Sequence, residues 1–491
     1  MAPRISPANA DPTAAARSTT APGPRRRLHD LPGPPGIPVF GNLLQLKRGS
    51  AHQTLEQWAR QYGAPFRFRA GSRTFLVVTN HEVTAGILRE RPDTFRRSSR
   101  LARVMEEAGL EPGVFIASGE AWKRQRRMVM AAFDPAHVKA YFPSLMEVAS
   151  RLRRRWLSAA AQDQAIDLLA DLTRYTVDGV AGLAFGAKVN TIDGREDVIQ
   201  RHLDHIFPAL FRRTMAPFSY WHYVKLGPDR HLPGHVQAIK EAVRGFIADA
   251  RARMVADPQL SEHPTNLLEA MLAAAQREDG AVADSDIAGN VFTMLQAGED
   301  TTANTLAWLI WLLKRNPAAL ARCISETEDV AADLSSLGTE RLAQLPYLDA
   351  CINEAMRLKP VAPYFINEAM HDTVVGDVEI EARTVVWSIN RFDSVNEKYF
   401  VNAGAFEPER WLAGGLHGND SAKRVVMPFG GGPRICPGRY LALLEIKLAM
   451  VMLLANFEIV DVWTPDGKEP REFLTIVMAP VGLRMRLRVK E

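Results

Sequence analysis

The feature that most constrains the fold is one long helical run near the middle of the chain. It begins near Ser285 and continues to Asn316, where Pro317 stops it. At ~1.5 Å per residue such a helix spans roughly 45 Å, enough to cross a whole domain. No linker-like stretch separates this run from the other amphipathic segments. The sequence therefore predicts one large, mainly α-helical domain.

Strand signals are confined to two short segments. The segment FRFRAGSRTFLVVT (66–79) alternates and then becomes β-branched, which indicates a hairpin. The segment HDTVVGDVEIEARTVVWSIN (371–390) is the second strand-rich stretch. We expect small sheets beside a helical body.

Residues 1–30 are rich in Pro, Ala, Arg and Thr and show no apolar periodicity. This composition predicts a disordered tail, followed by a domain over 31–491. The tail is also Arg-rich and poor in acidic residues, as organelle transit peptides are. Its five prolines oppose the amphipathic helix that such peptides form.

Composition excludes several classes of protein. Hydrophobic residues make up 47% and charged residues 24%, which is typical of a soluble globular protein. The net charge is +4, of which residues 1–30 supply +3. The rest of the chain is therefore nearly neutral, which argues against nucleic-acid binding. The sequence contains no run of eighteen uncharged apolar residues, so we expect no membrane span. Three cysteines are too few for a disulfide framework and favour a reducing, cytoplasmic location.

The segment FGGGPRICPG (429–438) carries the chemistry. A single cysteine, Cys436, cannot build a zinc site, but it can supply one axial ligand to a haem iron. The glycines let the backbone turn N–H groups toward the sulfur, and a helix expected from Pro437 adds its positive end. Arg434 can pair with a haem propionate. The alternative is an inert buried thiol.

This window matches Phe-Gly-x-Gly-x-Arg-x-Cys-x-Gly at every fixed position. It resembles the haem-binding signature of the cytochrome P-450 superfamily, in the form of a soluble bacterial-type member. The resemblance covers residues 31–491. It implies a large helical domain with small β-sheets packed at one side, and haem b whose iron is bound by Cys436.

Further motifs of that family follow in its usual order. Trp122 and Arg126 share a helix face and resemble the pair that donates to the haem propionates. Glu354 and Arg357 resemble the family's Glu-x-x-Arg, which implies a buried network with Arg410. The alternative for this pair is a solvated surface bridge worth under about 1 kcal/mol.

One position departs from the family pattern. Many relatives carry an arginine that contacts a propionate where this chain has Asn367. That contact is therefore either missing or supplied from elsewhere.

The middle of the long helix, LQAGEDTT (295–302), is similar to the family's oxygen-activating segment. The small residues Ala297 and Gly298 would let haem-bound oxygen and substrate approach the helix. The resemblance makes Asp300 and Thr301 the catalytic pair, with the Thr301 hydroxyl bonded back to the Ala297 carbonyl. Asp300 would supply protons. An N-cap or surface Asp-Thr-Thr is the alternative, but the segment lies mid-helix.

The resemblance also indicates residues that line a chiefly apolar cavity for a hydrophobic small-molecule substrate. They are Phe115, Ile116, Ala362 and Tyr364, with a late turn at 474–476. The aromatic run 206–224 could be a lid, a membrane contact, or packing within the helical body.

Only 55 residues follow Cys436, too few for a flavin or iron–sulfur module. We therefore expect a separate electron donor, a ferredoxin or flavodoxin with its reductase. A positive face formed by Lys123, Arg124 and Arg127 would suit an acidic donor, although a solvated charge run is an equal alternative.

Three functions follow from these motifs. The first is a monooxygenase that uses O2 and two electrons, and the second a peroxide-using or hydroperoxide-rearranging enzyme. The third is a haem-based sensor or ligand-sequestering protein. The Asp300–Thr301 pair favours the first, because the other two functions need no relayed protons.

Overall fold

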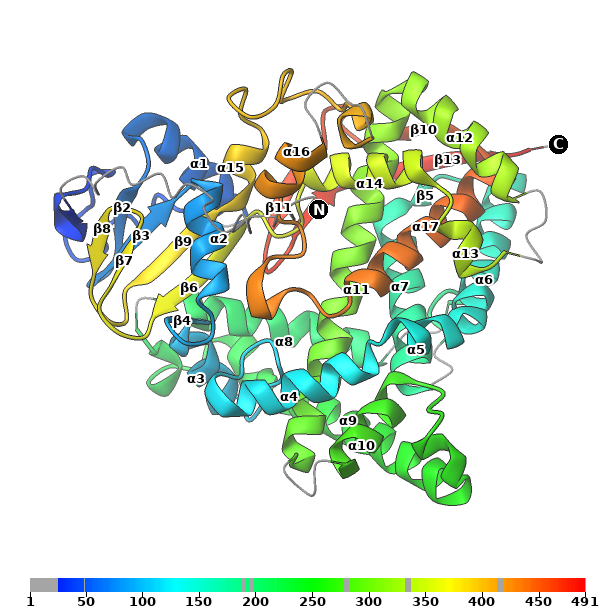
Figure 1. Ribbon diagram of the computed structural model, residues 1–491, viewed down its shortest axis with the longest axis horizontal. Helices are drawn as coiled ribbons and strands as arrows, with labels where there is room; N and C mark the ends of the chain where they lie inside the picture. Colours follow the sequence, from blue (N-terminus) through cyan, green and yellow to red (C-terminus); the bar gives the residue numbers. More distant parts are fainter. Residues whose placement is uncertain are drawn as a thin grey trace, which may run out of the picture.

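The structure is a computed structural model that describes residues 25–47, 49–186, 190–194, 198–216, 218–277, 282–331, 337–412 and 419–490. Helices form most of the body, and a sheet of five strands lies to one side of them (Figure 1). This arrangement confirms the predicted fold class.

The helices are α1 (Ala51–Tyr62), α2 (His81–Arg89), α3 (Ser99–Glu107), α4 (Gly119–Ala132), α5 (Pro135–Ala140), α6 (Phe142–Ala161), α7 (Leu168–Phe185), α8 (Val198–Met215), α9 (Gly227–Ala256), α10 (Leu267–Arg277), α11 (Asp284–Arg315), α12 (Pro317–Ala331), α13 (Thr339–Leu342), α14 (Pro346–Leu358), α15 (Asn390–Ser394), α16 (Asn419–Val425) and α17 (Arg439–Asn456). The strands are β1 (Arg26–Arg27), β2 (Phe66–Ala70), β3 (Arg73–Val78), β4 (Phe95–Arg96), β5 (Ile166–Asp167), β6 (Tyr364–Ala369), β7 (Thr373–Val375), β8 (Val378–Ile380), β9 (Val385–Ile389), β10 (Phe457–Trp463), β11 (Arg471–Leu474), β12 (Met478–Val481) and β13 (Arg484–Val489).

The long central helix is confirmed as α11, which runs through the middle of the body in Figure 1. It packs against α7, α14 and α17. Apolar residues cover most of its length, and Trp308 in its second half is fully buried. Because α11 is enclosed on several sides, the polar residues in its middle need a specific explanation.

Both strand-rich segments are also confirmed. Strands β2 and β3 form the predicted hairpin, with Phe66 opposite Val77. The segment 371–390 contributes β7, β8 and β9, of which β9 runs parallel to β3. The five-stranded sheet has the order β2-β3-β9-β6-β4, so β9 joins the hairpin to β6.

Two boundaries differ from the sequence prediction. Residues 25–30, assigned to the tail, fold as β1 and a short 3-10 turn, with Arg26 Nε 2.8 Å from Asp377 Oδ2. A two-residue strand has no periodicity, so this pairing leaves no signal in the sequence. The helix after Cys436 begins at Arg439 and not at Pro437. Residues 1–24 lie outside the described part of the chain.

No helix in the described ranges is both long and apolar enough to cross a membrane. The aromatic run 206–224 divides between two environments. Ile206, Leu210 and Trp221 are buried, whereas Phe218 and Tyr223 are exposed.

Candidate functional site

The Cys436 loop is shaped by backbone contacts that require glycine. Gly432 has φ +64°, and a Cβ there would lie 2.1 Å from the carbonyl oxygen of Leu88. The Cys436 N–H donates to the Phe429 carbonyl at 3.0 Å, which closes the loop. Gly438 then leads into α17, so the positive end of this helix lies just after Cys436.

Two opposing effects act on the Cys436 thiol. Burial raises its pKa, whereas a hydrogen bond from the Gly438 backbone and the charges of Arg126 and Arg439 lower it. Burial dominates, and the pKa lies above the ordinary value. Cys436 nevertheless has solvent-exposed surface, so its sulfur is accessible to a ligand. A metal ion would convert this thiol to a thiolate by coordinating it.

Four sequence-predicted residues meet around this loop. Arg126 donates to the Ile435 carbonyl at 2.7 Å. The guanidinium carbon of Arg434 lies 4.6 Å from the centre of the Trp122 ring. Trp122, Arg126, Arg434 and Cys436 therefore share one site, although they come from α4 and from a loop some 300 residues later in the chain.

Two arginines that sequence reasoning missed belong to the same site. Arg97 stacks on Phe115, with its guanidinium carbon 4.0 Å from the ring centre. Burial lowers the pKa of both Arg97 and Arg434 to about 10. Burial, together with the charges of Arg97 and Arg434, lowers the pKa of Arg91 to about 9. The four guanidiniums of Arg91, Arg97, Arg126 and Arg434 are called the arginine cluster below.

The arginine cluster lacks its counter-charge. Within the described ranges, Arg91, Arg97 and Arg434 form no ion pair with a carboxylate, and the Nε atoms of Arg97 and Arg434 are buried without a hydrogen-bond partner. Desolvated cations of this kind are costly unless an anion pairs with them. The two propionates of a haem are such an anion, so the residues present fit that group.

Asn367 lies in β6 and is fully buried, and neither of its side-chain polar atoms has a hydrogen-bond partner in the described part of the chain. It therefore does not reproduce the arginine contact of the family pattern. The sequence offered no signal for Arg97 and Arg91 as replacements, because their distance from Cys436 along the chain follows no local motif.

The middle of α11 presents a small set of polar groups. The Thr301 hydroxyl donates to the Ala297 carbonyl at 2.8 Å, the bond expected from the sequence. Ala297 is exposed, so α11 is uncovered by protein on this face. Burial, aided by the charge of Asp204, raises the pKa of Asp300 to about 6.

Gly298 differs from the prediction. A Cβ at this position would lie 2.5 Å from Cγ2 of Val180 in α7. The glycine therefore permits close helix packing and does not widen the reaction cavity.

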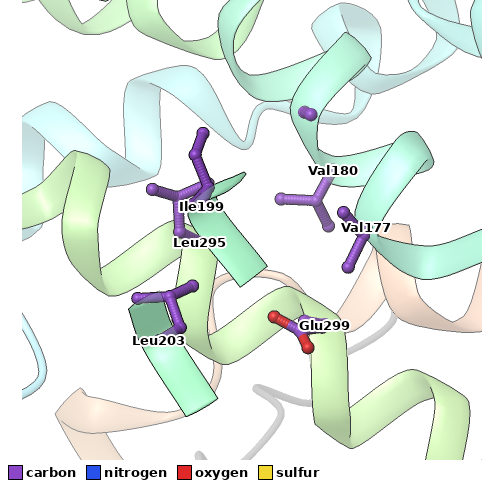
Figure 2. A pocket seen from close by; sticks show the side chains of 7 residues that line it. Val177, Val180, Ile199, Leu203, Leu295 and Glu299 are labelled. Atoms are coloured by element: carbon purple, nitrogen blue, oxygen red, sulfur yellow. The ribbon is translucent and has the colours of Figure 1, made fainter. Parts of the chain in front are cut away.

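Beside Gly298, a cavity with room for about one water molecule lies between α7, α8 and α11 (Figure 2). Its walls are apolar except for Glu299, which points into it.

Glu354, Arg357 and Arg410 form one buried network. Arg357 donates to both carboxylate oxygens of Glu354, at 2.8 and 2.7 Å, and Arg410 donates at 3.0 Å. The Trp411 indole adds a fourth hydrogen bond at 2.8 Å. The solvated-bridge alternative is wrong, because Glu354 and Arg357 are fully buried. The network joins α14 to the loop that precedes the Cys436 segment.

The four residues expected to contact substrate lie in two groups. Phe115 and Ile116 follow α3, with Phe115 half exposed and Ile116 buried. Ala362 and Tyr364 follow α14, and the Tyr364 ring centre is 4.8 Å from that of Trp387. The late turn 474–476 reaches the second group, since Met478 N–H donates to the Val361 carbonyl at 2.8 Å.

The basic residues proposed as a docking face are partly neutralised. Lys123 pairs with Glu120 at 2.7 Å, and Arg124 lies 3.8 Å from Asp286. The face is therefore less positive than the sequence implies.

A model of the family described as cytochrome P450 matches residues 31–486. This chain belongs to the cytochrome P450 family. The chain is 27% identical to a self-sufficient cytochrome P450 monooxygenase of Exserohilum turcicum, over 95% of this chain and 43% of that protein. It is 25% identical to cytochrome P450 4A6 of Oryctolagus cuniculus, over 94% and 91% of the two chains.

The fold agrees with a solved cytochrome P450 structure. The haem domain of a cytochrome P450DA mutant superposes with a TM-score of 0.80 at 23% identity, covering 96% of this chain and 98% of that one. The chain spans less than half the length of several curated relatives that it matches.

Membership of the cytochrome P450 family implies a haem held by a cysteine thiolate. Cys323 and Cys351 are fully buried and lie against each other, with their sulfurs 3.4 Å apart. Cys436 has exposed surface and lies beside the arginine cluster. Cys436 is therefore the candidate ligand.

Proposed function

We propose that this chain is a haem-thiolate monooxygenase that inserts one oxygen atom from O2 into a hydrophobic small molecule. The observation that carries the proposal is the pairing of Cys436 with an arginine cluster that lacks carboxylate partners. A metal-binding sulfur and a site for two propionates thus occur together, as haem requires.

Cys436 would bind the iron of haem b. Trp122, Arg126 and Arg434 would donate to the propionates, together with Arg97 and Arg91. Arg97 would supply the contact that Asn367 does not make, because its buried Nε has no partner in the described protein. When bound, the haem supplies the iron at which dioxygen is reduced with two electrons and oxygen is transferred.

The residues of α11 would manage protons beside that iron. Asp300, with its pKa raised to about 6, holds a proton more readily than an ordinary carboxyl and is suited to general-acid work. Thr301 would hold its hydroxyl on the uncovered face of α11, with its proton donated to the Ala297 carbonyl and its oxygen available to accept a hydrogen bond. Ala297, which is small and exposed, would leave room there for dioxygen and substrate.

Substrate would contact Phe115, Ile116, Ala362 and Tyr364. Electrons would come from a ferredoxin or flavodoxin with its reductase, docked over the basic residues of α4. The fungal relative is named self-sufficient and is more than twice as long, so a donor domain on the same polypeptide is the competing arrangement. The unjoined thiols of Cys323 and Cys351 support a reducing compartment such as the cytoplasm.

The proposal is tested by the spectrum of the reduced, CO-bound protein, which should show the strongly red-shifted Soret band of thiolate ligation. Cys436→His should move the band to the position typical of imidazole ligation and abolish oxygenation. Cys323→Ser, the control, should keep the wild-type band. An unchanged spectrum in Cys436→His would contradict the assignment. Turnover supported by peroxide but not by O2 and electrons would favour the peroxide-using alternative.

A further inference from the structure

Histidines from two neighbouring helices meet where α8 packs along α9. His202 and His205 lie near the start of α8, and His231 and His235 lie one turn apart on α9. Nδ1 of His202 is 2.8 Å from Nδ1 of His235. The ring of His205 stacks on that of His235, with ring centres 4.4 Å apart and planes inclined by 17°. These four residues are called the histidine cluster below.

The contact between His202 and His235 restricts the protonation of both rings. One Nδ1 must donate and the other must accept, so at least one of the two imidazoles is uncharged. Two charged rings would set N–H against N–H and add a repulsion between like charges. Burial and the neighbouring charges of His205, His202 and His231 lower the pKa of His235 below its ordinary value. The folded protein therefore favours the uncharged form of His235.

Two cations flank the histidine cluster on α9, and both bind backbone carbonyls. Arg230 donates to the Lys225 carbonyl at 3.3 Å. Lys240 donates to the Gly109 carbonyl at 3.0 Å.

The other charged groups lie on α8 or on the helices packed against the pair. Arg201 precedes His202, and Asp204 is about half a turn around α8 from His202. The charge of Asp204 acts on Asp300 of α11. Hydrogen bonds or ion pairs join α8 to α3, and α9 to α10 and α11, at Arg213–Arg100, Arg253–Glu269 and Arg251–Asp284. These contacts are roughly two helical turns or more from the histidine cluster, so its rings titrate mainly against one another.

The two ends of α8 are held to α9 by different chemistry. At the far end, Arg212 and Arg213 pair with the buried Asp229, at 3.1 and 3.0 Å. At the near end, the histidine cluster makes the contact. Pro208 lies between these two points and cannot donate a helical hydrogen bond, so the two halves of α8 can move separately.

The first half of α8 also covers the reverse side of the candidate site. Ile199 and Leu203 line the water-sized cavity into which Glu299 points (Figure 2). Whatever holds this half of α8 in place therefore keeps that cavity closed.

We propose that the histidine cluster is a proton-sensitive clasp, which holds the first half of α8 on α9 at neutral pH and releases it in acid. Imidazoles are mostly uncharged above about pH 6.5, where the bond between His202 and His235 can form. Below that value the open form binds more protons than the closed form, so falling pH favours opening. The ion pairs of Asp229 keep the far end of α8 attached. Opening would admit water to the cavity beside Glu299.

Hydrogen exchange of α8, followed by mass spectrometry at pH 7.5 and 5.5, tests the clasp in the haem-loaded protein. Rates are divided by the intrinsic exchange rate at each pH. We expect the protection of residues 199–206 in the wild type to fall about tenfold at the lower pH, the factor that one pKa unit represents. Residues 209–215, beside the ion pairs of Asp229, should keep their protection.

His235→Gln removes the titrating ring from α9 and leaves the peptides of α8 chemically identical to those of the wild type. Glutamine cannot become charged, so this variant should lose much less protection between the two pH values. His202→Gln removes the partner ring from α8 and should behave in the same way. His263→Gln is the matched control, since His263 is exposed and follows the 3-10 turn Pro258–Ser261.

Equal protection of residues 199–206 at both pH values in the wild type would overturn the inference. An undiminished loss in His235→Gln and His202→Gln would do the same, and so would an equal suppression of the loss by His263→Gln. The inference does not rest on the proposed function, because exchange does not depend on turnover. The CO spectrum of the same preparations reports separately on that function.

Discussion

The Thr301 hydroxyl donates to the carbonyl of Ala297, one turn back along α11, at 2.8 Å. This bond fixes the hydroxyl on the face of α11 that the described protein leaves uncovered. Asp300 is adjacent, with its pKa raised to about 6. In the proposed function, the two groups would hold and pass protons at this point of the helix.

Thr301→Ala should uncouple turnover without emptying the pocket. Substrate should still bind and electrons should still be consumed, but more of them should appear as hydrogen peroxide and fewer as hydroxylated product. Thr305→Ala is the matched control, because Thr305 makes the same back-bond at 2.8 Å but is buried one turn further along. Product, peroxide and NAD(P)H oxidation are counted together with a surrogate redox chain. If Thr301→Ala and the wild type form the same amount of product per NAD(P)H oxidised, the proposed proton role of Thr301 is contradicted.

Asp300→Asn should slow turnover and flatten its dependence on pH. Because the pKa of Asp300 is about 6, its protonated fraction in the wild type falls as the pH rises through that value. Product formation limited by this proton should fall over the same window. Asparagine cannot titrate, so the variant should show a lower, flatter profile. Asp284→Asn, at the exposed start of the same helix, should keep the wild-type profile.

Removal of either partner from the buried network should destabilise the protein. Glu354→Gln or Arg357→Ala leaves an uncompensated buried charge, which costs about 3–5 kcal/mol of unfolding free energy. Both variants should also yield little haem-loaded protein, since the network holds the loop before Cys436. Chemical denaturation and the haem-to-protein ratio measure the two effects. Glu340→Gln, in the exposed pair with Lys139, should behave as the wild type.

Gly432→Ala and Gly430→Ala separate steric clash from backbone strain in the Cys436 loop. Both glycines have positive φ, +64° and +74°. A Cβ at Gly430 meets nothing within 4 Å, so its substitution should cost only about 1–2 kcal/mol of conformational strain. A Cβ at Gly432 would also collide with the Leu88 carbonyl, and this variant should lose haem. Equal haem content in the two variants would contradict the role of that contact.

Local patterns allowed much of the fold and part of the site to be predicted. The helix α11, the β2–β3 hairpin and the back-bond of Thr301 each depend on residues close together in the sequence, where spacing determines geometry. The buried network with Arg410 came from the family resemblance, since its members are some 50 residues apart.

The missed features all depend on contacts between distant segments. Arg91 and Arg97 approach Arg434 from more than 300 positions away, and no spacing rule connects them. Gly298 was predicted to let oxygen and substrate approach the helix because it is small, but its position opposite Val180 is set by how α7 packs on α11. Tertiary packing of this kind decides a side chain's surroundings without leaving a local pattern.

Glu445 is a carboxyl buried in α17 that faces Gly179 of α7 and Thr302 of α11. Burial raises its pKa from 4.5 to about 8, while a hydrogen bond with Thr302 acts in the opposite direction. One of its oxygens has no hydrogen-bond partner among the described residues, and a Cβ on Gly179 of α7 would lie 3.1 Å from that oxygen. At neutral pH the folded protein therefore keeps this proton, whereas the unfolded chain releases it.

The free energy of unfolding of Glu445→Gln should consequently exceed that of the wild type by a margin that grows as the pH rises. Below about 4.5 the carboxyl is protonated in both states, so the substitution should have little effect. Between 4.5 and about 8 the folded state binds more protons than the unfolded state, so the wild type loses unfolding free energy with rising pH. The total loss corresponds to up to about 5 kcal/mol, and glutamine removes it. The unfolding free energies of wild type, Glu445→Gln and the exposed control Glu458→Gln are measured from pH 4.5 to 9. A wild-type-to-Gln difference that stays constant over this range would show that Glu445 is ionised in the folded protein.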